Sequence, residues 1–208
     1  MSKLYFRYGA MNCGKTTALL QVAHNYEERG QHVIVIKPKV DKKGKNYIVS
    51  RLGVKRKVDI LLDVVDHPIT HIKEFLTNHI NCILVDEAQF LKKFQVDELY
   101  MIARLFDIPV ICYGLRTSSE VELFEGSERL LAIADKLEEL ITICRCGRRA
   151  TFNVRFNKQG KIVFGNQNEI AIDGIDASYE SYCGTCYLEK VRGYSKEDIL
   201  KQIEQEKK

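Results

Sequence analysis

The stretch Gly9-Ala10-Met11-Asn12-Cys13-Gly14-Lys15-Thr16 matches the pattern G-x-x-x-x-G-K-[ST] of a phosphate-binding loop at every fixed position. Glycines let such a loop curl, so that successive backbone N–H groups point inward at phosphate oxygens. The lysine adds a positive charge for the β and γ phosphates, and the hydroxyl of Thr16 is a ligand for Mg²⁺. The alternative is a chance glycine-rich turn.

The segments on both sides of the loop favour the first interpretation. Leu4–Tyr8 is typical of a strand that enters the loop. After the loop, apolar side chains recur at the spacing of one helix face, at Leu19, Val22, Ala23 and Tyr26. A helix that begins there points the positive end of its dipole at a bound anion. We therefore expect a nucleoside triphosphate to bind at Gly9, Ala10, Met11, Asn12, Cys13, Gly14, Lys15, Thr16 and Thr17.

Further apolar runs alternate with helical patterns along the chain. Strands are predicted at His32–Ile36, Asp59–Val65, Cys82–Val85, Ile108–Gly114 and Leu140–Ile143. Helices are predicted at about Pro68–Asn78, Phe94–Phe106 and Gly126–Ala134. Continuous apolar strands that alternate with helices indicate an α/β fold, with a parallel sheet covered on both faces.

Two segments have a different character. Lys37–Lys57 is rich in Lys, Arg and Gly with little apolar periodicity, so it is either a solvated surface loop or a mobile basic segment near the phosphates. Asp86 and Glu87 end an apolar strand. They are either solubilising charge or the acidic element that supports Mg²⁺ beside a nucleotide loop, and their place at a strand's carboxyl end favours the second.

Seven cysteines in a chain with a nucleotide loop favour a reducing compartment and a metal site over disulfides. Cys144, Cys146, Cys183 and Cys186 form two knuckles around a short β-like insert, which predicts a structural Zn²⁺ site, although the first knuckle is C-x-C. The alternative is free thiols. Cys82 and Cys112 are expected to pack in the core. The predicted division is 1–143 for the nucleotide-binding domain, 144–192 for a zinc-ribbon lobe and 193–208 for a charged tail. Ser195 either caps a short helix in that tail or precedes a frayed end.

Composition limits the kinds of partner that the protein is expected to bind. The net charge of +4 is mild and basic residues are spread along the chain, which argues against a nucleic-acid surface. No apolar run is long enough to span a bilayer, and Met1-Ser2-Lys3 leads directly into a strand. A cytoplasmic protein with no membrane partner is the expectation.

Taken together, the nucleotide loop, the strand that ends in Asp-Glu and the zinc ribbon resemble the type II (cytosolic-type) thymidine kinases. Asp86-Glu87-Ala88-Gln89-Phe90 matches that family's Asp-Glu-x-Gln-Phe. The resemblance implies a RecA-like P-loop sheet with a zinc lobe, a homotetramer, and feedback inhibition by the end-product triphosphate, dTTP. It also implies ATP-dependent phosphorylation of the 5′-OH of thymidine, and of deoxyuridine, with Mg²⁺.

The resemblance also implies roles for individual residues. Glu87 is the base that takes the proton from the 5′-OH, while Thr16, Asp86 and Asp41 support Mg²⁺. The nucleoside pocket matches Met11, Phe90, Leu115, Phe124, Ile170, Ile172 and Tyr179, and the last three belong to a closing loop, the lasso. The chain departs from the family pattern where Ser119 replaces a common aromatic residue and where Lys43 replaces an arginine, for which Arg51 is a substitute.

Two rival classes remain open on the sequence. A RecA-like, nucleic-acid-binding ATPase would use the zinc ribbon as its grip. Against it, the chain is short and no stretch interleaves basic residues with several aromatics. A regulatory nucleotide-binding module without chemistry is disfavoured by Glu87 beside Asp86.

Overall fold

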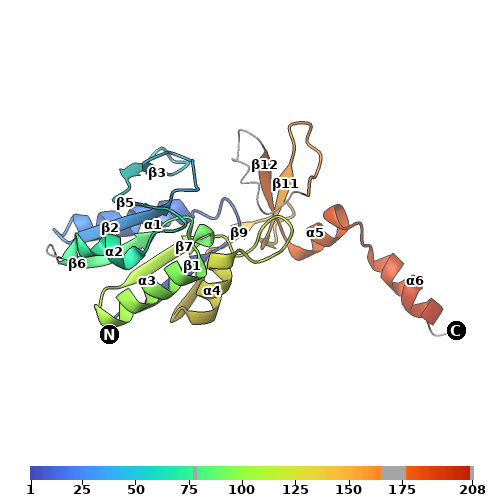
Figure 1. Ribbon diagram of the computed structural model, residues 1–208. Helices are drawn as coiled ribbons and strands as arrows, with labels where there is room; N and C mark the ends of the chain where they lie inside the picture. The colour runs from blue at the N-terminus through green and yellow to red at the C-terminus, as the bar shows by residue number, and fades with distance from the viewer. Residues whose placement is uncertain (77–78, 165–176, 207–208) are drawn as a thin grey trace.

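The computed structural model describes residues 1–76, 79–164 and 177–206. Within them, six parallel strands form a central sheet in the order β5-β2-β6-β7-β1-β8 (Figure 1). The strands are β1 (Leu4–Tyr8), β2 (His32–Pro38), β5 (Ile60–Leu62), β6 (Ile80–Val85), β7 (Val110–Gly114) and β8 (Lys136–Glu139). The flanking helices are α1 (Lys15–Glu27), α2 (Pro68–Lys73), α3 (Lys93–Leu105) and α4 (Glu125–Ile133). The predicted α/β class is confirmed.

Each face of the sheet has its own core. Side chains of a strand alternate between faces, so Ile34 and Ile36 of β2 pack with the helices α2, α3 and α4, while Val33 and Val35 pack with α1. All four are at most 2% exposed. The apolar runs of the sequence are continuous because successive side chains of one strand pack into the cores on both faces of the sheet.

The order of the strands brings three loops together. β6, β7 and β1 are neighbours and run in the same direction, so the segments that follow them leave the sheet at one edge. These segments are the phosphate loop after β1, Asp86 and Glu87 after β6, and Leu115 after β7. Crevices at the carboxyl ends of parallel strands are where α/β proteins bind ligands.

The prediction of the last strand, at Leu140–Ile143, was wrong. The sheet ends with β8 at Lys136–Glu139, whereas Thr142–Ile143 forms β9, which pairs with β10 (Arg149–Ala150) outside the sheet. β8 lies at the sheet edge and carries charges, including Glu138, which forms an ion pair with Arg7 at 2.5 Å. An edge strand has a solvated side, so it lacks the apolar run on which the prediction depended. Two other elements are shorter than predicted, because α2 ends at Lys73 and β5 spans only Ile60–Leu62.

The basic segment is more ordered than its composition suggested. It contains an antiparallel pair, β3 (Tyr47–Val49) and β4 (Lys55–Lys57), and Ile48 is 2% exposed. Lys37 is 1% exposed, and its ammonium forms an ion pair with Asp41 at 2.9 Å and donates to the carbonyl of Lys43. A buried charge is tolerated only when it is paired in this way. The segment therefore contains a buried residue and a strand pair that its weak apolar periodicity did not indicate.

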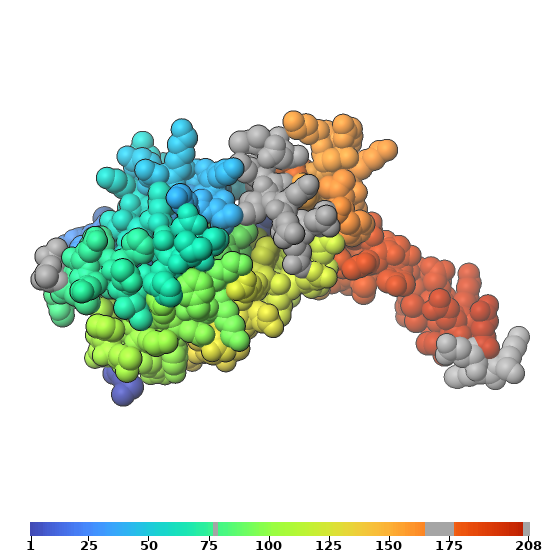
Figure 2. All heavy atoms as spheres, in the orientation of Figure 1, coloured from blue at the N-terminus to red at the C-terminus, as the bar shows by residue number. Residues whose placement is uncertain are grey.

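The carboxyl-terminal part forms a separate lobe. β11 (Phe152–Phe156) pairs with β12 (Ser178–Tyr182), and α5 (Gly184–Val191) follows. Helix α6 (Lys196–Glu206) extends away from the body, as Figure 2 shows. Ser195 caps α6, because its hydroxyl accepts a hydrogen bond from the N–H of Asp198 at 3.1 Å. Among the described residues, no helix is long and apolar enough to cross a membrane.

Candidate active site

The phosphate loop has the backbone that its sequence predicts. Gly14 has φ of +83° immediately before α1, a conformation that favours glycine, and Asn12 has φ of +66°. The ammonium of Lys15 lies inside the loop, 2.9 Å from the carbonyl of Ala10 and 3.2 Å from that of Gly9. The loop is thus wrapped around its lysine, with the N-terminus of α1 directly behind it.

Three carboxyl groups gather beside this loop. Asp86 is 5% exposed, and burial raises its pKa, with the negative charges of Glu87 and Asp41 adding to the effect. A divalent cation bound at Asp86 would offset this repulsion. Glu87 itself has a left-handed backbone, with φ of 50° and ψ of 39°, which is uncommon for a residue other than glycine.

Gln89 connects Glu87 to the segment after β7. It lies in the short 3₁₀ helix η2 (Ala88–Phe90) and is 2% exposed. Its amide nitrogen donates to the Glu87 carboxylate at 2.6 Å, and its amide oxygen accepts from the Leu115 N–H at 3.1 Å. The carbonyl of Leu115 accepts in turn from the hydroxyl of Ser127 on α4, at 2.6 Å. The carboxylate of Glu87 and the backbone of Leu115 are therefore held by one hydrogen-bonded chain.

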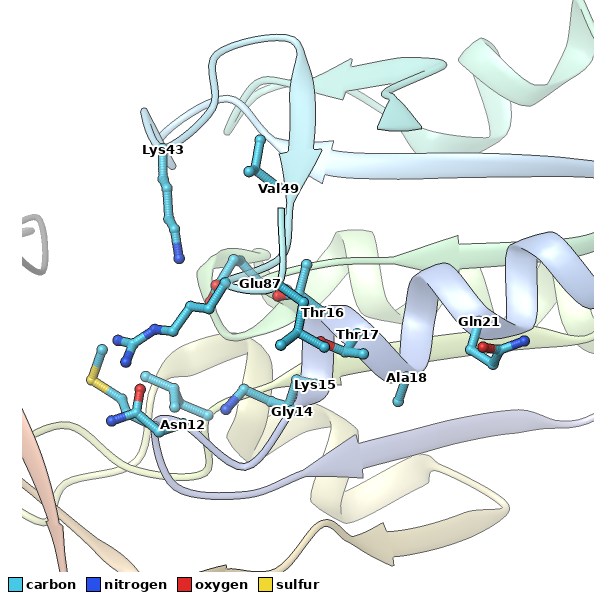
Figure 3. A pocket seen from close by; sticks show the side chains of 14 residues that line it. Asn12, Gly14, Lys15, Thr16, Thr17, Ala18, Gln21, Lys43, Val49 and Glu87 are labelled. Carbon is cyan, nitrogen blue, oxygen red and sulfur yellow. The ribbon is translucent and has the colours of Figure 1, made fainter. Parts of the chain in front are cut away.

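A pocket of about 600 Å³ lies at the phosphate loop (Figure 3). One side is the phosphate loop with the first turns of α1, and Glu87 and Leu115 also line the pocket. Lys43 and Arg51 come from the basic segment on the opposite side, where Lys43 points toward the cavity in Figure 3. A nucleoside triphosphate would meet positive charge on two sides and a carboxylate between them.

The four cysteines of the lobe converge. The sulfur atoms of Cys144, Cys146, Cys183 and Cys186 all lie within 4.8 Å of one another. Tetrahedral Zn²⁺ with Zn–S bonds of about 2.3 Å requires sulfur atoms about 3.8 Å apart. The 3.6 Å between the sulfur atoms of Cys146 and Cys183 is close to that value. The donor set therefore fits zinc, and the C-x-C spacing does not prevent convergence.

Comparison with known proteins decides the family. The sequence model described as thymidine kinase matches residues 2–187. The chain belongs to the thymidine kinase family. It is 48% identical to a thymidine kinase of Idiomarina loihiensis over 88% of this chain and 94% of that protein. It is 47% identical to a thymidine kinase of Shewanella oneidensis over 88% and 95%. Among solved structures, a DNA replication initiation factor gives a TM-score of 0.41 at 17% identity, over 67% of this chain and 40% of that one.

In this member of the thymidine kinase family, the predicted site residues are only partly gathered around the pocket. Met11 and Leu115 line it. Phe90 and Phe124 pack edge to face with each other, their ring centroids 5.8 Å apart, and neither lines the pocket. Tyr179 lies on β12 opposite Arg155. The predictions for Ile170 and Ile172 fall in residues 165–176, outside the described part of the chain.

Sequence reasoning missed several residues that hold the site. Gln89 entered only as a letter of the matched motif, and Ser127 not at all. Two residues of the lobe were also missed, since the side-chain oxygen of Asn153 accepts from the Met11 N–H at 2.7 Å and the hydroxyl of Ser181 donates to the Met11 carbonyl at 2.7 Å. No sequence pattern could have indicated these two residues, because more than 140 residues separate them from Met11 and only the fold brings them together.

Proposed function

We propose that the protein transfers the γ-phosphoryl group of ATP to the 5′-OH of thymidine, and of deoxyuridine, to give the monophosphate. The observation that carries the proposal is Glu87, which lines the same pocket as the phosphate loop and sits beside Asp86. The names of the relatives support the choice of acceptor.

In this proposal Glu87 accepts the proton of the 5′-OH as the hydroxyl attacks the phosphoryl group. A base aligned with the attacking oxygen contributes about 10² to 10⁴ in rate. Lys15 neutralises the β and γ phosphates, and Lys43 and Arg51 approach from the other side of the pocket. Thr16, Asp86 and Asp41 would hold Mg²⁺, which neutralises charge that develops on the phosphates when it is bound.

The acceptor pocket is proposed to lie next to Met11 and Leu115, with the aromatic pair of Phe90 and Phe124 behind it. Ile170, Ile172 and Tyr179 would close over the nucleoside. Ser119 stands where the family commonly has an aromatic residue, so one stacking contact, worth about 1 kcal/mol, is missing.

Zn²⁺ is proposed to bind Cys144, Cys146, Cys183 and Cys186 and to stabilise a lobe too small for burial alone. Metal analysis in reducing buffer should find one zinc per chain. The division into 1–143, 144–192 and 193–208 is part of the same proposal, as are a homotetramer, inhibition by dTTP and a cytoplasmic location.

The test is formation of thymidine monophosphate from Mg-ATP and a panel of nucleosides. Glu87→Gln should lower turnover by about 10²-fold or more. ATP should bind the variant as it binds the unaltered protein, which controls for folding. Turnover of another acceptor without any product from thymidine would overturn the choice of substrate, and near-normal turnover by Glu87→Gln would remove Glu87 from its role.

A nucleic-acid-stimulated ATPase is the rival to exclude. Adding single-stranded DNA to the same reaction without a nucleoside measures it directly. ATP hydrolysis that rises with DNA, together with no nucleoside monophosphate, would favour that class.

A further inference from the structure

Two side chains of the lobe hold a single residue of the phosphate loop. Asn153 of β11 and Ser181 of β12 are direct partners in the antiparallel register. Such partners present their side chains on the same face of the pair, a few ångströms apart. One supplies an acceptor and the other a donor, and both meet the backbone of Met11, each at 2.7 Å. The pair thus satisfies both the N–H and the C=O of one peptide residue.

The held residue precedes a turn of the loop. Asn12, the next residue, has φ of +66°, a left-handed conformation that asparagine adopts more readily than most residues other than glycine. Asn153 is 4% exposed, so its bond to Met11 is protected from competing water. The contact therefore acts where the loop reverses direction around the phosphate site.

The same strands lead into the cysteine cluster. Cys183 lies two residues beyond Ser181 and is 4% exposed. The intervening Tyr182 is tied to the lobe, because its carbonyl accepts from the N–H of Thr151 at 2.9 Å. A short, hydrogen-bonded stretch of β12 therefore joins the cysteine cluster to the side chains that hold Met11.

We infer that Asn153 and Ser181 are positioning residues of the phosphate loop, through which the lobe sets the geometry for nucleotide binding. The coupling is reciprocal by necessity, so a bound nucleotide should also stabilise β11 and β12. The inference rests on the proposed function only in that the loop binds a triphosphate, and no acceptor is needed to test it.

The first test titrates the full chain, at measured zinc content, with Mg²⁺ and a non-hydrolysable ATP analogue in a calorimeter. Asn153→Leu and Ser181→Ala should each weaken binding by about threefold to tenfold, the range for one lost hydrogen bond. Asn157→Leu is the matched control, because Asn157 caps the turn after β11 through the N–H groups of Gln159 and Lys161 and has no bond to Met11. This control should bind within about twofold of the unaltered protein. Equal weakening by the control, or full affinity in the Asn153→Leu/Ser181→Ala double variant, would overturn the inference.

The second test needs no nucleotide affinity. Hydrogen exchange of the free protein should be faster at residues 10–16 in the double variant than in the unaltered chain, while Asn157→Leu leaves these amides unchanged. Unchanged exchange at the loop would refute the role of Asn153 and Ser181 as positioning residues, whether or not a nucleotide binds. Failure of the unaltered protein to bind a nucleotide would count separately, against the proposed function. Should Asn153→Leu fail to fold, Ser181→Ala alone decides, because its small and partly exposed side chain leaves no large cavity.

Discussion

Replacing Gln89 with methionine isolates the connection between Glu87 and Leu115. Methionine has nearly the same length and volume as glutamine, so the buried position stays filled. The change removes the donor to the Glu87 carboxylate at 2.6 Å and the acceptor for the Leu115 N–H at 3.1 Å. Gln89 is 2% exposed, so water cannot replace either group without a rearrangement.

The magnitude follows from these two bonds. A hydrogen bond to a charged group contributes about 1.5–3 kcal/mol and a neutral one about 1 kcal/mol. If the first is needed to aim Glu87 at the acceptor hydroxyl, its loss lowers kcat by about 10- to 100-fold, since each tenfold change corresponds to about 1.4 kcal/mol. The KM for ATP should change little, because neither bond involves the phosphate loop.

A second buried glutamine provides the matched control. Gln95 is also 2% exposed; it accepts from the N–H of Lys92 at 2.9 Å and donates to the carbonyls of Asp63 and Asp66 at 2.7 and 2.9 Å. Gln95→Met should therefore lower the melting temperature at least as much as Gln89→Met, with kcat unchanged. Steady-state kinetics and thermal unfolding of both variants measure this difference.

A double-variant cycle separates positioning from general damage. If Gln89 acts through Glu87, then Gln89→Met should cost almost nothing in kcat when Glu87→Gln is already present. A full additional loss in that background would refute the reasoning. So would an equal fall in kcat for Gln95→Met.

Two further predictions concern the same corner of the fold. Burial and neighbouring acids raise the pKa of Asp86 to about 8, so its favourable contribution is complete below about pH 4 and is lost as pH rises to about 8. In metal-free protein, Asp86→Asn should remove up to about 1.4 kcal/mol per pH unit from that fall in unfolding free energy, as denaturant titrations at pH 5 and pH 8 would measure. Gly114→Ala should lower kcat in parallel with Gln89→Met, because a Cβ there would lie 2.9 Å from the Gln89 amide oxygen and displace it; unchanged kcat in this variant would contradict the assigned geometry.

The sequence predicted the parts of the fold whose signals are local. The phosphate loop, the buried strands β1, β2, β6 and β7, and the cysteine pairs each carry their pattern within a few residues. The edge strand β8 was placed too late, because its charged residues conceal a strand with one solvated side. The same limit applies to Lys37. The basic composition of its segment suggested that this side chain is solvated, whereas in the structure it forms an ion pair with Asp41.

The residues proposed to carry the chemistry have a signal in the sequence, whereas the residues that hold them in place do not. Lys15 and Glu87 belong to short motifs with a known mechanism. Gln89 bonds the Glu87 carboxylate two residues away and the backbone of Leu115, whereas Asn153 and Ser181 bond the backbone of the distant Met11. No residue pattern encodes these contacts. Phe90 and Phe124 were both predicted to line the nucleoside pocket. They form a ring pair and do not line the pocket at the phosphate loop, so their role at the nucleoside stays a prediction.

If Glu87 is the base proposed above, its left-handed backbone sets stability against catalysis at one position. Glycine or asparagine would adopt φ of 50° more easily than glutamate, by about 1 kcal/mol, and neither offers a carboxylate. A lineage that drifts without demand for phosphoryl transfer therefore has a downhill route to a sturdier, inert protein through this residue. In a relative, replacement of the acid at position 87 would then be an early sign that catalytic activity has been lost, and it would appear before any change in the phosphate loop.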